Sequence, residues 1–224
     1  MELKGLKAVF LGDSITEGHG CSSPDKVFWQ VLAARTGLEV KGFGVGGSRI
    51  ARQAPSVPPV AYDEDFGRRA MRMDKDADII CVFGGTNDFG HGTAPIGEFN
   101  DTDPNTFYGA LNAMFTYLID TYPHSFIFVM TPLHRSHEEE ASFNTKNPNS
   151  LPLIEYVRII RQMAERYSIP VLDLFEMSGI YPVVRPVRDA YMPDGLHPND
   201  LGHAKLAGLV EQFLKNSYYE RIEH

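Results

Sequence analysis

The stretch KAVFLGDSITEGHG, residues 7–20, contains a short apolar run that passes directly into Gly-Asp-Ser. A strand that is apolar along its whole length is typical of a parallel sheet, whose two faces are both covered by helices. Gly12 would allow the chain to turn at the end of this strand, and Ser14 would follow the turn. By itself, the motif is compatible with a capping serine or with a nucleophile held at the edge of a sheet.

The same pattern of strand and helix repeats along the rest of the chain. Short apolar or glycine-terminated runs predict four more strands, at residues 38–47, 77–85, 125–132 and 169–174. Helical spacing of apolar residues, together with N-terminal proline or aspartate, predicts helices at 24–37 and 103–122, from 150 and from near 198. This alternation predicts an α/β protein with three α/β/α layers around a doubly wound parallel sheet.

The composition limits the classes of partner. A chain of 224 residues predicts a single domain over residues 1–224. The net charge of −8 argues against nucleic acid and membrane surfaces as partners. Two cysteines, Cys21 and Cys81, do not form a disulfide framework, and no apolar run approaches the length of a membrane span. These features predict a cytoplasmic protein, and they leave its oligomeric state open.

Three predicted strands end in glycine followed by polar residues. They are the segments at 12–14, 44–48 and 84–88, the last reading Gly-Gly-Thr-Asn-Asp. Ligands of a doubly wound sheet bind at the carboxyl ends of the strands, and a parallel sheet brings these ends to one edge. We therefore expect the three segments to form one site.

A serine hydroxyl needs a base to act as a nucleophile. In MPDGLHPND, Asp194 precedes His197 by three residues, with Gly195 between them. Such a turn can direct both side chains the same way, so that the carboxylate holds the imidazole Nδ1–H and leaves Nε2 to accept the serine proton. Alternatively, the segment is a surface turn with a capping aspartate. The catalytic interpretation requires Ser14 and His197 to meet in the fold.

An acyl-transfer site also needs donors for a developing oxyanion. The candidates are the backbone amides of Ser14 and Gly47 and the side-chain amide of Asn87. Each of them has a structural alternative, because glycine at a strand end usually marks a turn and asparagine there often caps a helix.

The blocks FLGDSIT, GGTND and DGLHP, with a glycine turn after the second strand, resemble the SGNH (GDSL-like) hydrolase family. The resemblance implies a flavodoxin-like fold with five parallel strands and metal-independent hydrolysis of an ester or thioester, without a cofactor. It also implies a catalytic triad of Ser14, His197 and Asp194, with an oxyanion hole formed by Ser14, Gly47 and Asn87. The second block departs from the family pattern, since it reads GFGVGGSRI, and Gly46 is the alternative to Gly47.

Of the segments that could cover the site, at 48–61, 88–103 and 132–149, the second and third offer no continuous apolar face. We therefore predict a small acyl group, acetyl first, on a polar alcohol such as a carbohydrate, with Arg49 and Arg135 as candidate contacts at the edge of the site. Both arginines could equally be solvated. The alternatives are a lipase or thioesterase for longer chains, an acyltransferase, and a flavodoxin-like binding module without activity. A metal hydrolase is disfavoured, because the three histidines that could approach the site lack ligand spacing: His19, His91 and His134.

Overall fold

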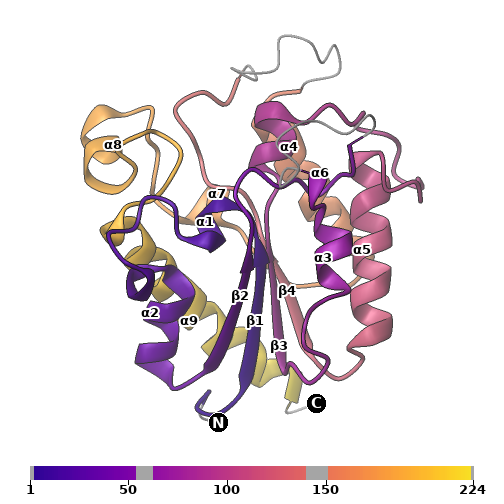
Figure 1. Cartoon of the computed structure of the whole chain (residues 1–224), viewed down its shortest axis with the longest axis horizontal. Coiled ribbons are helices and arrows are strands. Elements are labelled where there is room, and N and C mark those ends of the chain that lie inside the picture. Colours follow the sequence, from indigo (N-terminus) through magenta and orange to yellow (C-terminus); the bar gives the residue numbers. More distant parts are fainter. Residues whose placement is uncertain (1–2, 54–62, 140–150, 223–224) are drawn as a thin grey trace.

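The computed structural model describes residues 3–53, 63–139 and 151–222, which form an α/β fold around one sheet (Figure 1). Five parallel strands lie in the order β2-β1-β3-β4-β5. Their bounds are Lys7–Gly12 for β1, Glu39–Gly44 for β2, Ile79–Phe83 for β3, Phe126–Met130 for β4 and Val171–Leu172 for β5. The predicted five-stranded parallel sheet is confirmed.

Helices cover both faces of the sheet (Figure 1). One face packs against α2 (Phe28–Thr36) and α9 (Asp200–Ile222), and the other against α3 (Phe66–Ala70), α5 (Phe107–Thr121) and α6 (Leu153–Arg166). Neighbouring residues of β1 alternate between the two cores, with Phe10 in one and Leu11 in the other. This is the predicted three-layer arrangement. In the described residues, no helix is both long and apolar enough to cross a membrane.

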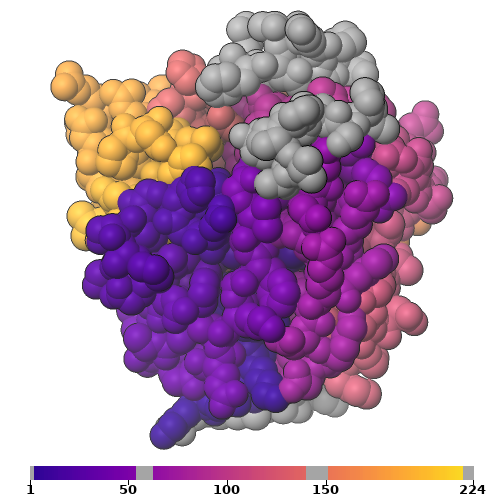
Figure 2. Space-filling model, in the orientation of Figure 1, coloured from indigo at the N-terminus to yellow at the C-terminus, as the bar shows by residue number. Residues whose placement is uncertain are grey.

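Short helices gather where the strands end (Figure 1). They are α1 (Ser14–Glu17), α4 (Thr86–His91), α7 (Leu174–Met177) and α8 (Arg185–Tyr191), together with a 3₁₀ turn at Pro24–Lys26. Figure 2 shows the first and last parts of the chain side by side on one face, in indigo and yellow. A hydrogen bond of 2.8 Å from the Ser22 amide to Asp200 is one of the contacts that join them.

Several predicted boundaries were wrong by a few residues. The helix expected at 24–37 is interrupted at Val27, which has extended backbone, and the strand expected to reach 47 ends at Gly44. The helix expected from Asp103 begins at Phe107 because Thr106 caps it, while the Asp103 carboxylate accepts the Asn105 amide. The last helix begins at 200, and the expected start at 150 lies outside the described residues.

Glycine at the ends of β1 and β2 permits close approach of α1. A Cβ atom at Gly12 would lie 1.9 Å from the Thr16 hydroxyl oxygen, and one at Gly44 would lie 2.2 Å from the Glu17 amide nitrogen. The chain can therefore reverse directly after β1 and place Ser14 at the first position of α1.

Candidate active site

Ser14, His197 and Asp194 form a continuous chain of hydrogen bonds. The Ser14 Oγ lies 3.0 Å from His197 Nε2, although the two residues are 183 positions apart in the sequence. His197 Nδ1 lies 2.7 Å from Asp194 Oδ2. Ser14 is presented by the turn after β1, whereas the other two residues come from the loop between α8 and α9. The structure therefore brings the three predicted residues together.

The Asp194 carboxylate is held by its own turn. Its Oδ1 accepts the amides of Leu196, at 2.8 Å, and of His197, at 2.7 Å. Gly195 allows this turn with a φ of +77°. Partial burial alone would raise the pKa of Asp194, but the hydrogen bonds from His197 and Leu196 outweigh burial and lower it below its ordinary value. The carboxylate is thus ionised at neutral pH and favours the tautomer with a proton on Nδ1, which leaves Nε2 as an acceptor facing Ser14.

Asp13 has a structural contact of its own. Its carboxylate Oδ1 accepts the Ile15 amide at 3.0 Å and so caps α1. Burial raises the pKa of Asp13 to about 7. The Ser14 amide lies in the first turn of this helix, where backbone N–H groups have no intrahelical acceptor. That amide is one of the three predicted oxyanion donors.

The two glycines of the turn after β2 differ in their hydrogen bonding. The Gly46 amide donates to Glu17 Oε2 at 2.7 Å. Gly47 has a φ of +72°, and within the described part of the chain its amide has no acceptor. Of the two candidates, Gly47 is the one whose N–H is available to a substrate.

The Asn87 side chain is fixed at the start of α4. Its Nδ2 donates to the Ser48 carbonyl at 3.0 Å, and its Oδ1 lies 3.2 Å from His91 Nε2. A side-chain amide carries two N–H groups, so one remains for a substrate. The next residue, Asp88, accepts the amides of Ile50 at 2.9 Å and Ala51 at 2.8 Å. These bonds join α4 to the segment that follows Gly47.

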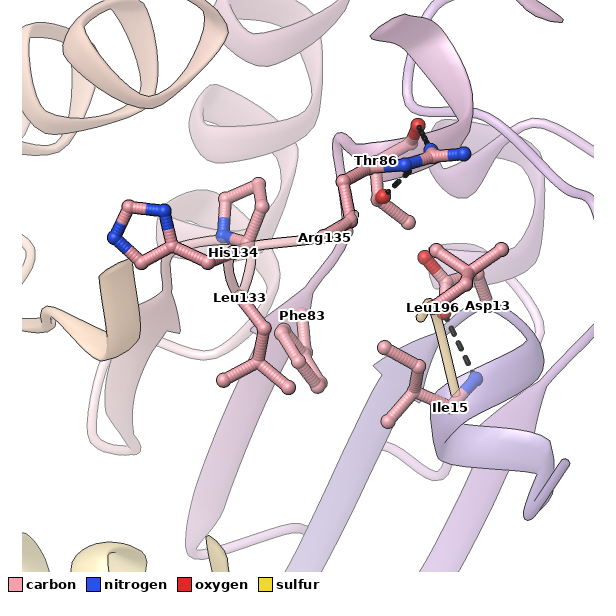
Figure 3. Close-up of a pocket in the computed structure, with 10 residues that line it drawn as sticks. Asp13, Ile15, Phe83, Thr86, Leu133, His134, Arg135 and Leu196 are labelled. Atoms are coloured by element: carbon pink, nitrogen blue, oxygen red, sulfur yellow. Dashed lines mark hydrogen bonds between the residues drawn. The ribbon is translucent and has the colours of Figure 1, made fainter. Parts of the chain in front are cut away.

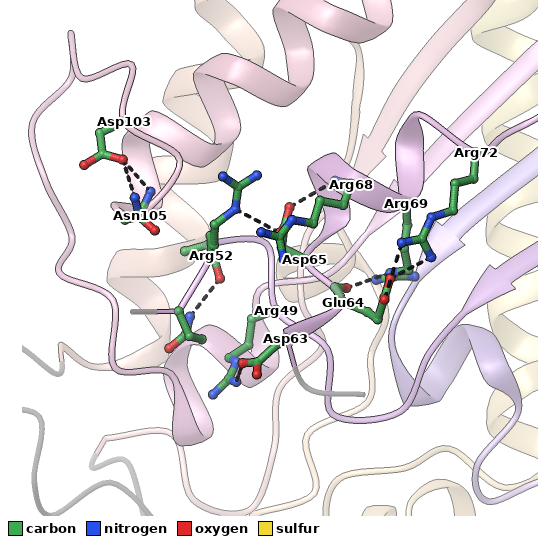
Figure 4. Close-up of polar contacts among 12 residues, drawn as sticks. Arg49, Arg52, Asp63, Glu64, Asp65, Arg68, Arg69, Arg72, Asp103 and Asn105 are labelled. Atoms are coloured by element: carbon green, nitrogen blue, oxygen red, sulfur yellow. Dashed lines mark hydrogen bonds and ion pairs between the residues drawn. The ribbon is translucent and has the colours of Figure 1, made fainter. Parts of the chain in front are cut away.

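Both arginines expected at the edge of the site are buried. Arg49 is fully enclosed, 3.5 Å from the Asp63 carboxylate, and donates to the His91 carbonyl at 3.0 Å (Figure 4). Arg135 donates from Nη1 to the carbonyl and hydroxyl of Thr86, at 3.1 and 3.2 Å (Figure 3). Their contact with substrate stays an untested prediction, and their burial argues against it.

The three histidines considered as metal ligands have separate surroundings. His134 bonds to Glu138 at 2.9 Å and packs on the Phe175 ring, and His91 bonds to Asn87. The His19 ring centroid lies 5.4 Å from that of His197, and its Nε2 lies 3.2 Å from Glu17. Among the described residues, no group of three potential ligand side chains could hold a metal ion.

A small pocket is lined in part by the sequence neighbours of Ser14 and His197 (Figure 3). Asp13 and Ile15, which flank Ser14, and Leu196, which precedes His197, line it together with residues that follow β3 and β4. Its volume of about 10 Å³ leaves room for about one water molecule. Phe83 and Leu133 make part of its wall apolar.

The profile of the GDSL-like Lipase/Acylhydrolase family matches residues 10–205. The chain belongs to this family. As a GDSL-like acylhydrolase it is a carboxylic ester hydrolase. No curated protein matches the sequence.

Solved structures resemble this GDSL-like acylhydrolase over nearly its whole length. One is 34% identical, with a TM-score of 0.84 over 97% of this chain and 99% of the other. A protein from Lactobacillus plantarum is 29% identical, with a TM-score of 0.82 over 96% and 98% of the two chains. A carbohydrate acetylesterase family member from Sinorhizobium meliloti is 16% identical, with a TM-score of 0.64 over 94% and 97%. At 16% identity, the similarity to this last protein shows only that the two chains share a fold.

The residues that hold the donors in place are not evident from the sequence. Glu17, Ser48 and Asp88 bind backbone or side-chain groups from distant segments. No local pattern marks such residues, because their partners depend on how the strands are paired. Ser48 and Asp88 had a weak signal, because both lie in the segments at 44–48 and 84–88 that follow predicted strands.

Proposed function

We propose that this acylhydrolase uses Ser14 as nucleophile, His197 as general base and Asp194 as the residue that orients the imidazole. The observation that carries the proposal is the chain of contacts from Ser14 Oγ to His197 Nε2, at 3.0 Å, and from His197 Nδ1 to Asp194, at 2.7 Å. Both distances are those of hydrogen bonds. The arrangement matches the roles that a serine hydrolase requires.

In the proposed reaction, His197 Nε2 accepts the Ser14 proton as Oγ bonds to the ester carbonyl carbon. The carbonyl electron pair moves to oxygen, and the oxyanion accepts hydrogen bonds from the amides of Ser14 and Gly47 and from Asn87 Nδ2. The intermediate collapses to the acyl-enzyme, and the leaving alcohol takes the proton from His197. Water then attacks the acyl carbon by the same steps and regenerates free Ser14.

For the substrate we propose an ester of a small acyl group, acetyl first, with a polar alcohol such as a carbohydrate. The polar sequence of the segments at 88–103 and 132–149, which offer no continuous apolar face, supports a short acyl group. The name of the Sinorhizobium meliloti protein makes acetylated carbohydrates a reasonable first panel. We further propose that residues 1–224 act as one domain, while a cytoplasmic location stays a prediction.

A longer acyl chain is the second candidate, and an apolar surface favours it. Four large apolar side chains from the end of α7 to the start of α8 are more than 40% exposed: Met177, Tyr181, Val183 and Val184. The Tyr181 ring centroid lies 4.9 Å from that of His134, which lines the small pocket. An acyl chain that left the site in this direction could bury apolar surface, at about 0.8 kcal/mol per methylene.

Replacing the nucleophile or the base tests the proposed mechanism. Ser14→Ala and His197→Ala should each lower kcat by ~10³-fold or more, because either variant loses the activated nucleophile. A fluorophosphonate should label the wild type and not Ser14→Ala, whereas a binding module would remain unlabelled in both. Near-full esterase activity of Ser14→Ala would exclude this mechanism. Assays with and without an alcohol acceptor separate hydrolysis from acyl transfer.

A series of p-nitrophenyl esters from acetate to palmitate decides between the two acyl lengths. For the small-acyl proposal, kcat/KM should be highest at acetate and fall as the chain lengthens. A steady rise toward decanoate would instead support the apolar surface from the end of α7 to the start of α8 as the acyl site. The same series on Met177→Ser then tests that surface directly.

A further inference from the structure

Arg69 is a buried arginine on α3 that the proposed mechanism does not use. Only 3% of the residue is exposed, and its guanidinium lies over the Phe66 ring, 4.5 Å from the centroid. Its Nε donates to the Glu64 carbonyl at 2.9 Å. Its two terminal nitrogens bond to groups at the ends of β1 and β2 and in the turn after β2.

These terminal nitrogens bind groups from the segments that carry the candidate oxyanion donors. Nη1 donates to the carbonyl of Gly12, at 2.8 Å, and to that of Phe43. Nη2 donates to the Ser48 hydroxyl at 2.8 Å. Gly12 is two residues before Ser14, and Ser48 directly follows Gly47.

Ser48 links Arg69 to the third candidate donor, Asn87. Its hydroxyl bonds to the Val45 carbonyl, at 2.6 Å, and accepts from Arg69, while its carbonyl accepts from Asn87 Nδ2. One guanidinium is therefore bonded to the strand before Ser14, to the turn that holds Gly47 and, through Ser48, to Asn87.

We propose that Arg69 is a positioning residue that fixes the spacing of the three oxyanion donors. The inference rests on the proposed function, since it assumes that Ser14, Gly47 and Asn87 bind the oxyanion. Arg69 itself is not expected to touch the substrate. Its effect would be on the transition state, where donors misplaced by a fraction of an ångström lose much of their stabilising energy.

The chemistry of arginine suits this role. A guanidinium is planar and directs five N–H groups along fixed lines, so it can bind several acceptors at once. Burial lowers the pKa of Arg69 to about 10, and the guanidinium remains charged at neutral pH. Lysine would keep the charge, but its donors leave a single nitrogen and cannot reach the Gly12, Phe43 and Ser48 oxygens with the same geometry.

The neighbouring arginines provide matched controls (Figure 4). The side chain of Arg68 is 49% exposed and lies 3.3 Å from Asp65, and that of Arg72 is 60% exposed and lies 2.7 Å from Glu64. No contact of either residue reaches the strand ends within the described part of the chain. Replacement of Arg68 therefore changes the same helix without changing the proposed network.

The test compares Arg69→Lys, Arg68→Lys and Ser48→Ala with the wild type on p-nitrophenyl acetate. Arg69→Lys should lower kcat about 10- to 100-fold with KM within about 3-fold, since the loss is confined to the transition state. Ser48→Ala should also lower kcat without a large change in KM. Arg68→Lys should keep kcat within about 2-fold of the wild-type value. In Arg69→Lys/Ser48→Ala the two losses should not multiply, because both variants break the same network. Circular dichroism and urea unfolding check that each variant is folded.

The outcomes separate this inference from the proposed function. Activity retained by Ser14→Ala would refute the proposed function. If Ser14→Ala is inactive while a folded Arg69→Lys keeps the wild-type kcat, the positioning role alone is refuted. A change in KM alone, or equal losses in Arg69→Lys and Arg68→Lys, would also overturn it. Should Arg69→Lys fail to fold, Ser48→Ala decides, and an unchanged kcat in that variant rejects the network.

Discussion

The side chains proposed to carry out the chemistry are each held by a second group that fixes their orientation. Asp194 accepts two amides of its own turn and then binds the His197 ring. Asn87 is held through Ser48 and His91, which leaves one of its N–H groups available. Because the orienting groups are mostly backbone atoms, the site is set before substrate arrives, and little reorganisation accompanies the reaction.

Asn87 allows this preorganisation to be measured at one residue. Asn87→Ala should lower kcat by ~10²- to 10³-fold with little change in KM, since one oxyanion donor is lost. Asn112→Ala is the control, because both asparagines are 6% exposed and each donates to a backbone carbonyl, that of Asp101 in the case of Asn112. The control should keep its kcat. A loss confined to KM in Asn87→Ala would mean that Asn87 binds substrate and transition state equally.

At the scale of elements, the sequence predicted what depends on local pattern. The strands other than β2 were found from continuous apolar runs such as that of β1, which are typical of sheets covered on both faces. The strand β2, which reads EVKGFG, was found from the glycines at its end. Helix starts were less certain, as at Phe107, where Thr106 and not Asp103 provides the cap. The motifs after β1 and before α9 marked Ser14, Asp194 and His197 as candidates, but the contact between Ser14 and His197 depends on how the two ends of the chain pack. The role of Arg69 could not be predicted, because three neighbouring arginines in FGRRAMR look alike until the helix is packed on the strand ends.

The turn between β1 and α1 provides a test at this scale. Gly12→Ala should destabilise the protein by about 1–3 kcal/mol, because the new Cβ would lie 1.9 Å from the Thr16 hydroxyl oxygen and α1 would have to shift. Gly208→Ala is the matched control in α9, where the nearest atom, on Arg35, would lie 3.6 Å away. There alanine should stabilise the protein by up to about 1 kcal/mol through its higher helix propensity. Urea unfolding measures both, and equal effects would disprove the packing argument.

At the scale of the whole molecule, the first and last parts of the chain close the fold around the candidate site. The Ser14–His197 contact requires α1 and the segment before α9 to be docked together. The His203 side chain in α9 is fully buried, and its Nδ1 accepts the Phe28 amide of α2 at 3.2 Å. The His203 and Phe28 rings are stacked, with their centroids 6.1 Å apart. The packing of α9 on α2 therefore includes a buried residue that can be protonated, His203.

Acidification should weaken this closure. Burial lowers the pKa of His203 to about 4, against about 6.5 for an unfolded histidine. Between these values the unfolded chain binds a proton at this position and the native protein does not, so the contribution is fully present above about pH 6.5 and is lost as the pH falls toward 4. His203→Asn keeps an acceptor for the Phe28 amide and does not titrate. The free energy of unfolding of wild type minus that of His203→Asn should therefore decrease by at most about 3 kcal/mol between pH 6.5 and 4. A constant difference for His203→Asn, measured by urea unfolding across this range, would show that His203 is protonated equally in the folded and unfolded states.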